Sequence, residues 1–240
     1  MTDPVPAARL KRYAPCLGQP AHAHDAAHLS LVLAGGFEET DARAARSIGA
    51  GRAGLRPEGL RHAVRFGPAG AVVLTFAAPP RADDSPAVAD PAWSPRLPRA
   101  HLRRLVPLLL EGAEIGREAA WDLLALCDGS PSRPRPDPWL IAVRDRLIEA
   151  PASARLIDIA HQAGRHRVHL GRAFLAAFGE TPSVFRRRAM LDRALCLSAG
   201  GLPAALAAVD AGFADQSHFT RACRDLYGLP PGRLIGRVAA

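Results

Sequence analysis

The chain has a single lysine, few aromatic residues and little cysteine. Because Lys11 is that lysine, nearly all of the 31 basic side chains are arginines. The four cysteines are scattered and form no CxxC pair, which argues against a zinc cluster and against a disulfide framework. The longest apolar runs fall far short of the roughly 20 residues that a membrane span needs, and residues 1–12 lack the apolar core of a signal peptide. These absences predict a cytoplasmic protein that does not associate with membranes.

Charge and composition predict a globular protein with a basic C-terminal part. Of the 240 residues, 48% are hydrophobic and 22% are charged, and the formal net charge is +8. Residues 137–240 hold 14 basic and 9 acidic side chains, against 17 and 14 in the longer part before them. Arginine is the side chain best shaped for bidentate contacts with phosphate and guanine. A nucleic-acid partner is therefore compatible with the composition.

Two proline-rich stretches, residues 77–98 and 129–138, divide the chain into three parts because neither can sustain a helix or a sheet ladder. From 13 to 76, short apolar runs alternate with glycine-bearing turns, which predicts several strands. From 97 to 126, the spacing of leucine predicts two amphipathic helices. Everything beyond Asp137 is predicted to be helical.

The helical part contains an internal repeat with a period of 49 residues. The matching pairs are Arg172 and Arg221, Ala173 and Ala222, Phe178 and Tyr227, Gly179 and Gly228, and Pro182 and Pro231. Each copy follows an Ala-Gly pair, Ala163-Gly164 or Ala211-Gly212, and glycine suits the tight turn of a helix-turn-helix unit. The repeat therefore predicts two such units.

In each unit the second helix is expected to bury one face and to expose the other. The first is predicted over residues 166–178, with Leu170, Phe174 and Phe178 inward. The second is expected to begin at Asp215, a good N-cap, with Phe219 and Leu226 inward. Polar side chains at a helix N-terminus suit base readout in the major groove. The outward residues are Arg167, Val168, Gly171 and Arg172 in the first unit, and Gln216, Ser217, Thr220 and Arg221 in the second.

The segment GFADQSHFTRACRDLYGLPPGRL, residues 212–234, resembles the C-terminal signature of the AraC/XylS family of bacterial transcription regulators. The resemblance covers about residues 137–240. It implies that a long helix, here about 182–198, joins the two units, and that both recognition helices enter consecutive major grooves of promoter DNA. It assigns base reading to Val168, Gly171, Arg172, Gln216, Ser217 and Arg221, and backbone contacts to His169 and Thr220. It also implies contact with RNA polymerase, as in an activator, and is compatible with a homodimer; the sequence alone does not fix the sign of regulation or the oligomeric state.

The sequence departs from the family pattern at four positions. His166 stands where the family usually has a serine cap, and Gly171 offers no side chain for readout. Ala207 replaces a bulky apolar residue in the second support helix, and Pro203 enters near the first turn of that helix, where proline is tolerated. The second unit is therefore expected to be packed less firmly than the first.

Histidines in the first part of the chain resemble the two motifs of the cupin barrel. His22-x-His24 is followed by His28 and Gly35, and Gly51 is followed by Pro57-x-Gly59-x-x-His62. In metal-binding cupins these positions supply three histidines and a glutamate, and here His28 replaces the glutamate. The resemblance implies that His22, His24, His28 and His62 converge from one strand pair and a facing strand. They would bind one divalent transition metal, zinc, iron, nickel or copper. Structural or surface histidines, or a cavity for an organic effector, are the alternatives.

The sequence thus predicts an α+β protein of two domains. Residues 1–128 form a cupin-like sensor and dimerisation domain, with a β-barrel over about 13–78 and helices over about 97–127. Residues 129–136 are the linker, and 137–240 form an all-α double helix-turn-helix domain. The helices near 97–127 either cover the barrel or form a dimer interface.

The predicted function is sequence-specific transcription regulation on double-stranded promoter DNA, controlled by a small-molecule effector and without enzymatic activity. One alternative is a metal-dependent cupin enzyme, an oxygenase or isomerase, with a helical appendage. An architectural DNA binder without an effector is another.

Overall fold

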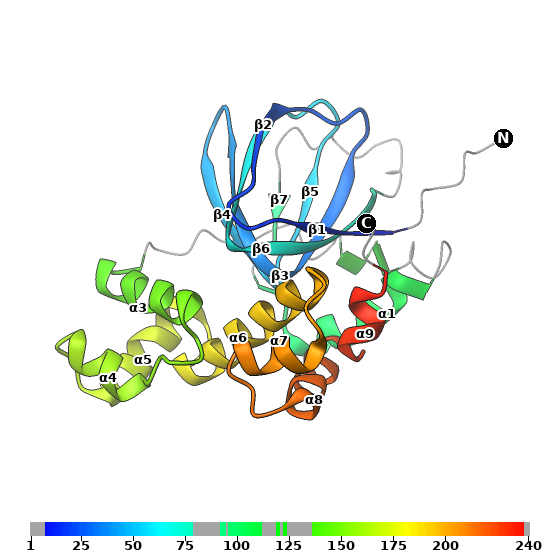
Figure 1. The fold of residues 1–240 in the computed structure, drawn as a ribbon. Helices are drawn as coiled ribbons and strands as arrows, with labels where there is room; N and C mark the ends of the chain where they lie inside the picture. Colours follow the sequence, from blue (N-terminus) through cyan, green and yellow to red (C-terminus); the bar gives the residue numbers. More distant parts are fainter. Residues whose placement is uncertain are drawn as a thin grey trace.

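The protein is described by a computed structural model over residues 8–78, 92–94, 96–111, 119–120, 122–123 and 136–237. A curved antiparallel sheet forms one half of the molecule, and a layer of helices lies against one side of it (Figure 1). The antiparallel sheet followed by helices confirms the predicted α+β class. The expected linker, residues 129–136, lies outside the described residues except for residue 136. Most of the second helix expected before residue 127 also lies outside them.

The sheet has seven described strands. They are β1 (Arg9–Tyr13), β2 (Gly18–His22), β3 (His28–Asp41), β4 (Ala45–Gly49), β5 (Ala53–Arg56), β6 (His62–Ala77) and β7 (Ala92–Trp93). Their hydrogen-bonded order is β1-β6-β3-β5-β7, with β2 paired to β6 and β4 paired to β3. The long strands β3 and β6 shift register between Val32 and Ala34 and again between Gly35 and Phe37, and such irregularities bend a sheet.

The sheet corrects two details of the predicted barrel. It begins at Arg9 rather than near residue 13, and β7 extends it beyond residue 78. Hydrogen bonds between the described strands do not close the sheet into a ring, because its path ends at β1 and β7. The predicted cupin-like barrel is, over these residues, a curved sheet that wraps around a pocket.

Strands β3 and β6 separate the pocket from the helices, because successive side chains of a strand point to opposite faces. Ser30 of β3, with Val73 and Thr75 of β6, lines the pocket. Their neighbours Leu29, Leu31 and Leu74 are fully buried in a core shared with the helices. We call these two faces the pocket side and the helix side.

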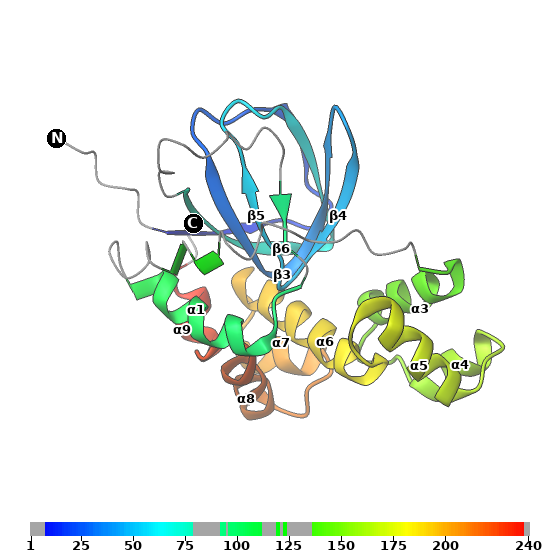
Figure 2. The same ribbon diagram turned by 180° about the vertical axis from the view of Figure 1, so that it is seen from behind.

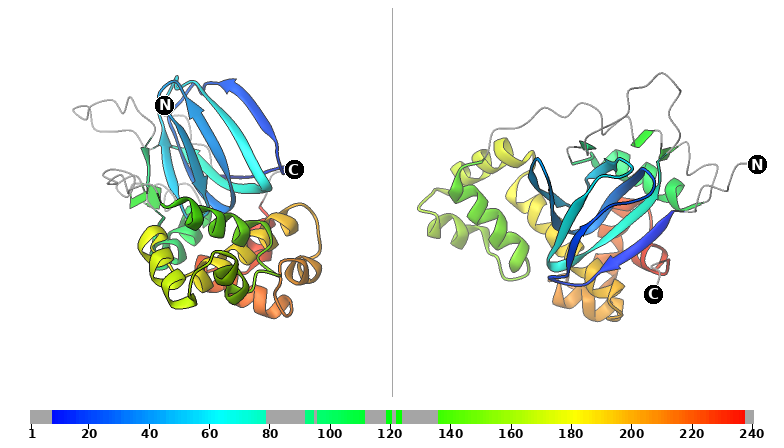
Figure 3. Two further views of the ribbon diagram at one scale, coloured as in Figure 1. Left: turned by 90° about the vertical axis from the view of Figure 1, so that its left-hand side faces the viewer. Right: turned by 90° about the horizontal axis from the view of Figure 1, so that it is seen from above.

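The described helices are α1 (Arg99–Glu111), α3 (Pro138–Glu149), α4 (Leu156–Gln162), α5 (Arg167–Phe178), α6 (Pro182–Ala199), α7 (Ala204–Asp210), α8 (Gln216–Tyr227) and α9 (Pro231–Ile235). Seen from behind, α1 lies beside α8 and α9, whereas α3, α4 and α5 stand apart at the other end (Figure 2). The side and top views place all of these helices on one side of the sheet (Figure 3). None of the described helices is both long and apolar enough to cross a membrane.

Two separate apolar cores hold the helices. The larger core joins the helix side of the sheet to α1, α6, α7, α8 and α9, and contains Leu105, Leu195 and Phe219. The smaller core lies among α3, α4, α5 and the start of α6, and contains Leu147 and Phe174. The apolar face of α1 is buried within the chain, where α1 packs beside α8, which argues against a free dimer face.

Candidate functional sites

The first helix-turn-helix unit consists of α4, a turn at Gly164 and α5. Gly164 has a φ of +63°, so the turn uses the left-handed conformation that glycine adopts without strain. His166 caps α5, because its Nδ1 accepts a hydrogen bond from the Val168 amide at 3.3 Å. Leu170 and Phe174 are buried as predicted. The histidine that replaces the expected serine therefore still serves as an N-cap.

The second unit repeats this design with α7, a turn at Gly212 and α8. Gly212 has a φ of +95°, and Asp215 Oδ1 accepts a hydrogen bond from the His218 amide at 2.7 Å, as the sequence predicts. Phe219 is fully buried. Helix α6 joins the two units, beginning after Thr181, whose hydroxyl accepts a hydrogen bond from the Val184 amide.

Most of the predicted DNA-contacting side chains lie on the surface. The exposed ones are Arg167, Val168, His169, Arg172, Gln216, Ser217 and Arg221, while Gly171 and Thr220 are half-buried. In the described part of the chain, Arg167, Arg172 and Arg221 form no ion pair with a carboxylate. Their guanidinium groups are therefore available for phosphates or base edges.

The second unit is tied to the sheet by polar contacts as well as by the shared core. The Tyr227 hydroxyl, at the end of α8, donates to the backbone carbonyl of Leu33 in β3. Arg99 Nε donates to the Asp225 carbonyl at 2.8 Å, and Arg237 donates to the Leu110 carbonyl. The second unit therefore sits on the sheet as part of one packed body.

A second set of polar contacts lies where Arg96, which follows β7, meets the end of the first unit and α6. Glu180 pairs with Arg96 and, at 2.9 Å, with Arg188. Arg188 also contacts Asp192 at 3.3 Å. Burial raises the pKa of Asp192 to about 6, although Arg188 and Arg96 oppose the shift. We call Arg96, Glu180, Arg188 and Asp192 the charged junction.

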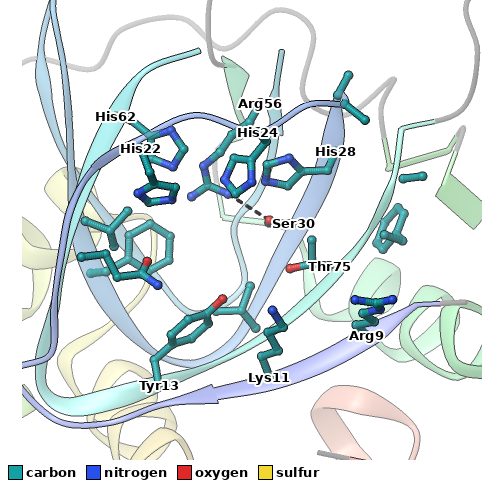
Figure 4. Close-up of a pocket in the computed structure, with 18 of the residues that line it drawn as sticks. Arg9, Lys11, Tyr13, His22, His24, His28, Ser30, Arg56, His62 and Thr75 are labelled. Carbon is teal, nitrogen blue, oxygen red and sulfur yellow. Dashed lines mark hydrogen bonds between the residues drawn. The ribbon is translucent and has the colours of Figure 1, made fainter. Parts of the chain in front are cut away.

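The pocket side of the sheet encloses a pocket of about 610 Å³ (Figure 4). Its upper wall carries His22, His24, His28, Arg56 and His62. Strand β1 supplies Arg9, Lys11 and Tyr13 from the opposite wall. A volume of this size is typical of small-molecule sites.

Three of the four predicted histidines converge. One ring nitrogen each of His22, His24 and His62 lies within 4.8 Å of the others. His22 Nδ1 lies 2.8 Å from the Pro20 carbonyl, and His62 Nδ1 lies 3.2 Å from the Leu60 carbonyl. Donation of Nδ1–H to a carbonyl leaves Nε2 with a free lone pair, the arrangement that metal-binding histidines use.

The structure corrects the predicted histidine set in two ways. His28 is not part of the converging group, and its ring instead lies edge-on against His24 with 4.3 Å between centroids. His62 does not come from a facing strand, because it is the register partner of His22 in the β2–β6 pair. Adjacent strands rather than opposite walls therefore bring His22 and His62 together, and His24 joins them from the loop that follows β2.

The environment keeps two of the imidazoles neutral near pH 7. Burial, followed by the neighbouring His62 and His22, lowers the pKa of His24 to about 4. Burial and then the Arg56 charge lower the pKa of His28 to about 3. A neutral imidazole has the lone pair that a metal ion or a hydrogen-bond donor requires.

Sequence analysis did not single out the buried ion pair beneath these histidines. Arg56 Nε donates to Glu39 Oε1 at 2.5 Å, and Arg56 Nη1 donates to the Ser30 hydroxyl at 2.9 Å. Trp93 Nε1 donates to the other Glu39 oxygen at 2.7 Å. Both charged residues are buried. No local motif marks them, because they are 17 residues apart in the sequence and are not register partners: Arg56 pairs with His28, and Glu39 pairs with Arg46 and Val64. The curvature of the sheet brings their side chains together.

Comparison with known proteins gives one family match. The family described as a helix-turn-helix domain matches residues 141–237, which include both units. Among solved structures, ToxT from Vibrio cholerae is 10% identical, covers 97% of this chain and 98% of its own, and has a TM-score of 0.44.

Two further solved structures match smaller parts of the chain. The C-terminal domain of AraT, a response regulator from Geobacillus stearothermophilus, is 19% identical over 45% of this chain and 92% of its own, with a TM-score of 0.41. An oxalate decarboxylase from Bacillus subtilis is 22% identical over 32% of this chain and 22% of its own, with a TM-score of 0.27. All three scores lie below 0.5, so these likenesses support no conclusion about function. No curated protein matches the chain.

Proposed function

We propose that this chain, a transcription regulator with an AraC-type helix-turn-helix domain at its C-terminus, changes its affinity for promoter DNA when a small-molecule effector fills the pocket of the curved sheet. The supporting observation is that β3 and β6 carry pocket residues on one face and the packing surface of the second unit on the other. We place this activity in the cytoplasm.

DNA reading is assigned to the two recognition helices, α5 and α8. The exposed Arg172 and Arg221 occupy matching repeat positions and are free of ion pairs among the described residues. We propose base contacts for them, for Val168 and Gly171 in α5, and for Gln216 and Ser217 in α8. Arg167, His169 and Thr220 contact the DNA backbone in this proposal.

Selection of bound fragments from random DNA tests this assignment. The expected site spans about two helical turns, with half-sites about 10–10.5 base pairs apart, and its affinity falls steeply with salt because arginine releases counterions. Arg221→Ala should cost about 1–3 kcal/mol at the selected site and relax one base position. Arg172→Ala is the matched variant in the first unit, and Arg233→Ala is a control outside both recognition helices. An equal loss on every sequence would reduce Arg221 to a phosphate contact.

The route from pocket to DNA passes through the two shared strands. A ligand that moves Ser30 or Thr75 on the pocket side displaces the same backbone that carries Leu31, Leu74 and the Leu33 carbonyl on the helix side. Packed cores transmit such shifts because they have low compressibility. The second unit therefore senses pocket occupancy directly, and α6 carries any change of angle to the first unit.

We further propose that His22, His24 and His62 hold one divalent transition metal, with His28 beside them. The donors fit, since all three offer nitrogen and the pKa of His24 is depressed to about 4. Such an ion needs ligand distances of about 2.0–2.1 Å for zinc. Zn²⁺ or Ni²⁺ should raise the melting temperature of the wild type but not of the His24→Ala, His62→Ala double variant. A control variant, His161→Ala on the exposed side of α4, should respond like the wild type.

The remaining partners are proposed on the resemblance to the family. An activator role implies contact with RNA polymerase, tested by transcription in vitro from the selected site. A homodimer is tested by sedimentation of the full chain. The rival function, a metal-dependent cupin oxygenase or isomerase, requires an ion with an open coordination position and predicts turnover that the double histidine variant loses.

A further inference from the structure

The pocket has an excess of positive charge. Arg9, Lys11 and Arg56 line it, whereas Asp25 is the single carboxylate among the described lining residues. The charge of Arg56 is already balanced by its ion pair with Glu39, so the excess comes from Arg9 and Lys11. Arg9 and Lys11 form no ion pair within the described part of the chain. The two imidazoles with depressed pKa values, His24 and His28, add no charge near pH 7.

Arg56, in the upper wall of the pocket, is held in place by contacts on several sides. Its guanidinium carbon lies 4.8 Å from the centre of the Trp93 ring and 5.6 Å from that of Phe37. Glu39 and Ser30 bind its Nε and Nη1, and Nη2 donates to no described residue. Because a fixed guanidinium loses little entropy on binding, it suits recognition of a carboxylate.

Strand β1 brings the other two cations, Arg9 and Lys11, to the pocket because alternate side chains of a strand point to the same face. Arg9, Lys11 and Tyr13 line the pocket, while Leu10 between them is buried in the large core. An apolar surface adjoins them, since Tyr13 stacks on Phe66 with 4.2 Å between ring centres and Phe37 lies edge-on to Phe66. The pocket therefore pairs a cationic edge with an aromatic wall.

We infer, building on the proposed function in which this pocket holds the effector, that the effector is a small organic anion. Its carboxylate is bound by Arg56 and Lys11, with Arg9 at the rim, and its apolar body lies against Tyr13 and Phe66. Charge-assisted hydrogen bonds of this kind are about twice as strong as neutral ones. A neutral analogue of the same shape loses them.

The single lysine offers a direct test in the full-length protein. Phenylacetate and hexanoate are compared with phenylacetamide and hexanamide, which keep the shape and lack the charge. Inorganic phosphate tests whether an apolar body is needed. Binding is measured by calorimetry, and acetylation of Lys11 by an amine-reactive ester is followed by mass spectrometry. We expect at least one carboxylate to bind about tenfold or more tightly than its amide, which corresponds to about 1.4 kcal/mol, and to protect Lys11 from acetylation.

Matched variants locate the charge. Lys11→Gln should weaken carboxylate binding about tenfold and leave amide binding unchanged. Arg65→Gln removes an exposed arginine from β6 that does not line the pocket, and should bind the carboxylate like the wild type. Both positions are exposed, so neither variant should change the melting temperature appreciably.

The outcomes separate the anion site from its regulatory role. Amides that bind as well as carboxylates, no binding by any probe up to millimolar concentration, or binding that leaves Lys11 unprotected would each overturn the anion assignment. DNA affinity is measured in parallel with each probe. Carboxylate binding that leaves DNA affinity unchanged would uphold the anion site and contradict the proposed effector function.

Discussion

The two helix-turn-helix units share a repeat but differ in what surrounds them. The first unit packs in a small core with α3 and Phe185. The second unit shares the large core with the sheet and α1. Leu170 and Phe219 occupy matching repeat positions and are equally buried, yet one touches only helices of its own domain. The same local sequence pattern therefore occurs in one unit whose core consists of helices alone and in one unit whose core includes the sheet.

The expectation that the second unit is packed less firmly than the first stays a prediction. Ala207, where a bulky residue was expected, is fully buried. A Cβ placed on Gly212 would lie 2.7 Å from the Ala152 Cβ, whereas one on Gly164 would meet nothing within 4 Å. The turn of the second unit is therefore more closely approached by neighbouring residues than the turn of the first.

The largest expected effect comes from deleting the matched core residues. Phe219→Ala should cost about 3–5 kcal/mol and Leu170→Ala about 2–5 kcal/mol. Because Phe219 belongs to the shared core, its loss should lower hydrogen-exchange protection throughout β3 and β6. The loss of Leu170 should affect only the elements of the smaller core, which are α3, α4, α5 and the start of α6. Reduced protection of the sheet in Leu170→Ala would show that the two cores are not independent.

A smaller effect is expected at the charged junction between the two units. Burial raises the pKa of Asp192 to about 6, so the folded state binds this proton more tightly than the unfolded state does. Its contribution to stability is complete below the unfolded pKa near 3.8 and is lost as the pH rises through about 6. Between pH 4.5 and 7.5 the wild type should therefore lose about 2 kcal/mol relative to Asp192→Asn. Urea denaturation of both proteins at the two pH values measures this, and parallel pH profiles would refute it.

The smallest effect is expected at the hydroxyl that distinguishes the repeats. Tyr227 matches Phe178 of the first unit, and its hydroxyl donates to the Leu33 carbonyl. Tyr227→Phe should cost about 1 kcal/mol, measured by thermal or urea unfolding. Phe178 is half-buried at the surface of the smaller core, so the reciprocal Phe178→Tyr should be nearly neutral. No loss of stability in Tyr227→Phe would mean that this hydrogen bond to the sheet contributes nothing to stability.

Local chemistry explains why much of the C-terminal part could be predicted. Asp215 caps α8, Gly164 and Gly212 take positive φ values, and α6 begins at Pro182. Each of these features depends on residues within a few positions of one another. The 49-residue period then predicts the second unit from the first. The family match over residues 141–237 agrees with that reading.

The pocket was harder to predict, because its residues meet through strand register. His22 and His62 were singled out, but their direct pairing across β2 and β6 was not. No sequence motif indicates the Arg56–Glu39 ion pair or the position of Lys11 in the pocket wall. Alternation along β1 was the one signal that could have indicated Arg9, Lys11 and Tyr13 as a set.

By itself, the sequence determined the two helix-turn-helix units, their caps and turns, and the histidines available for a site, since these follow from short-range periodicity and hydrogen bonding. Only the tertiary structure decided that the second unit packs on the sheet, that the pocket is cationic, and that His28 stands outside the converging group. Contacts such as Tyr227 with Leu33, 194 residues apart, depend on how whole elements pack. The decisive physical reason is that burial of a shared apolar surface, rather than any local preference, joins the pocket to the DNA-binding helices.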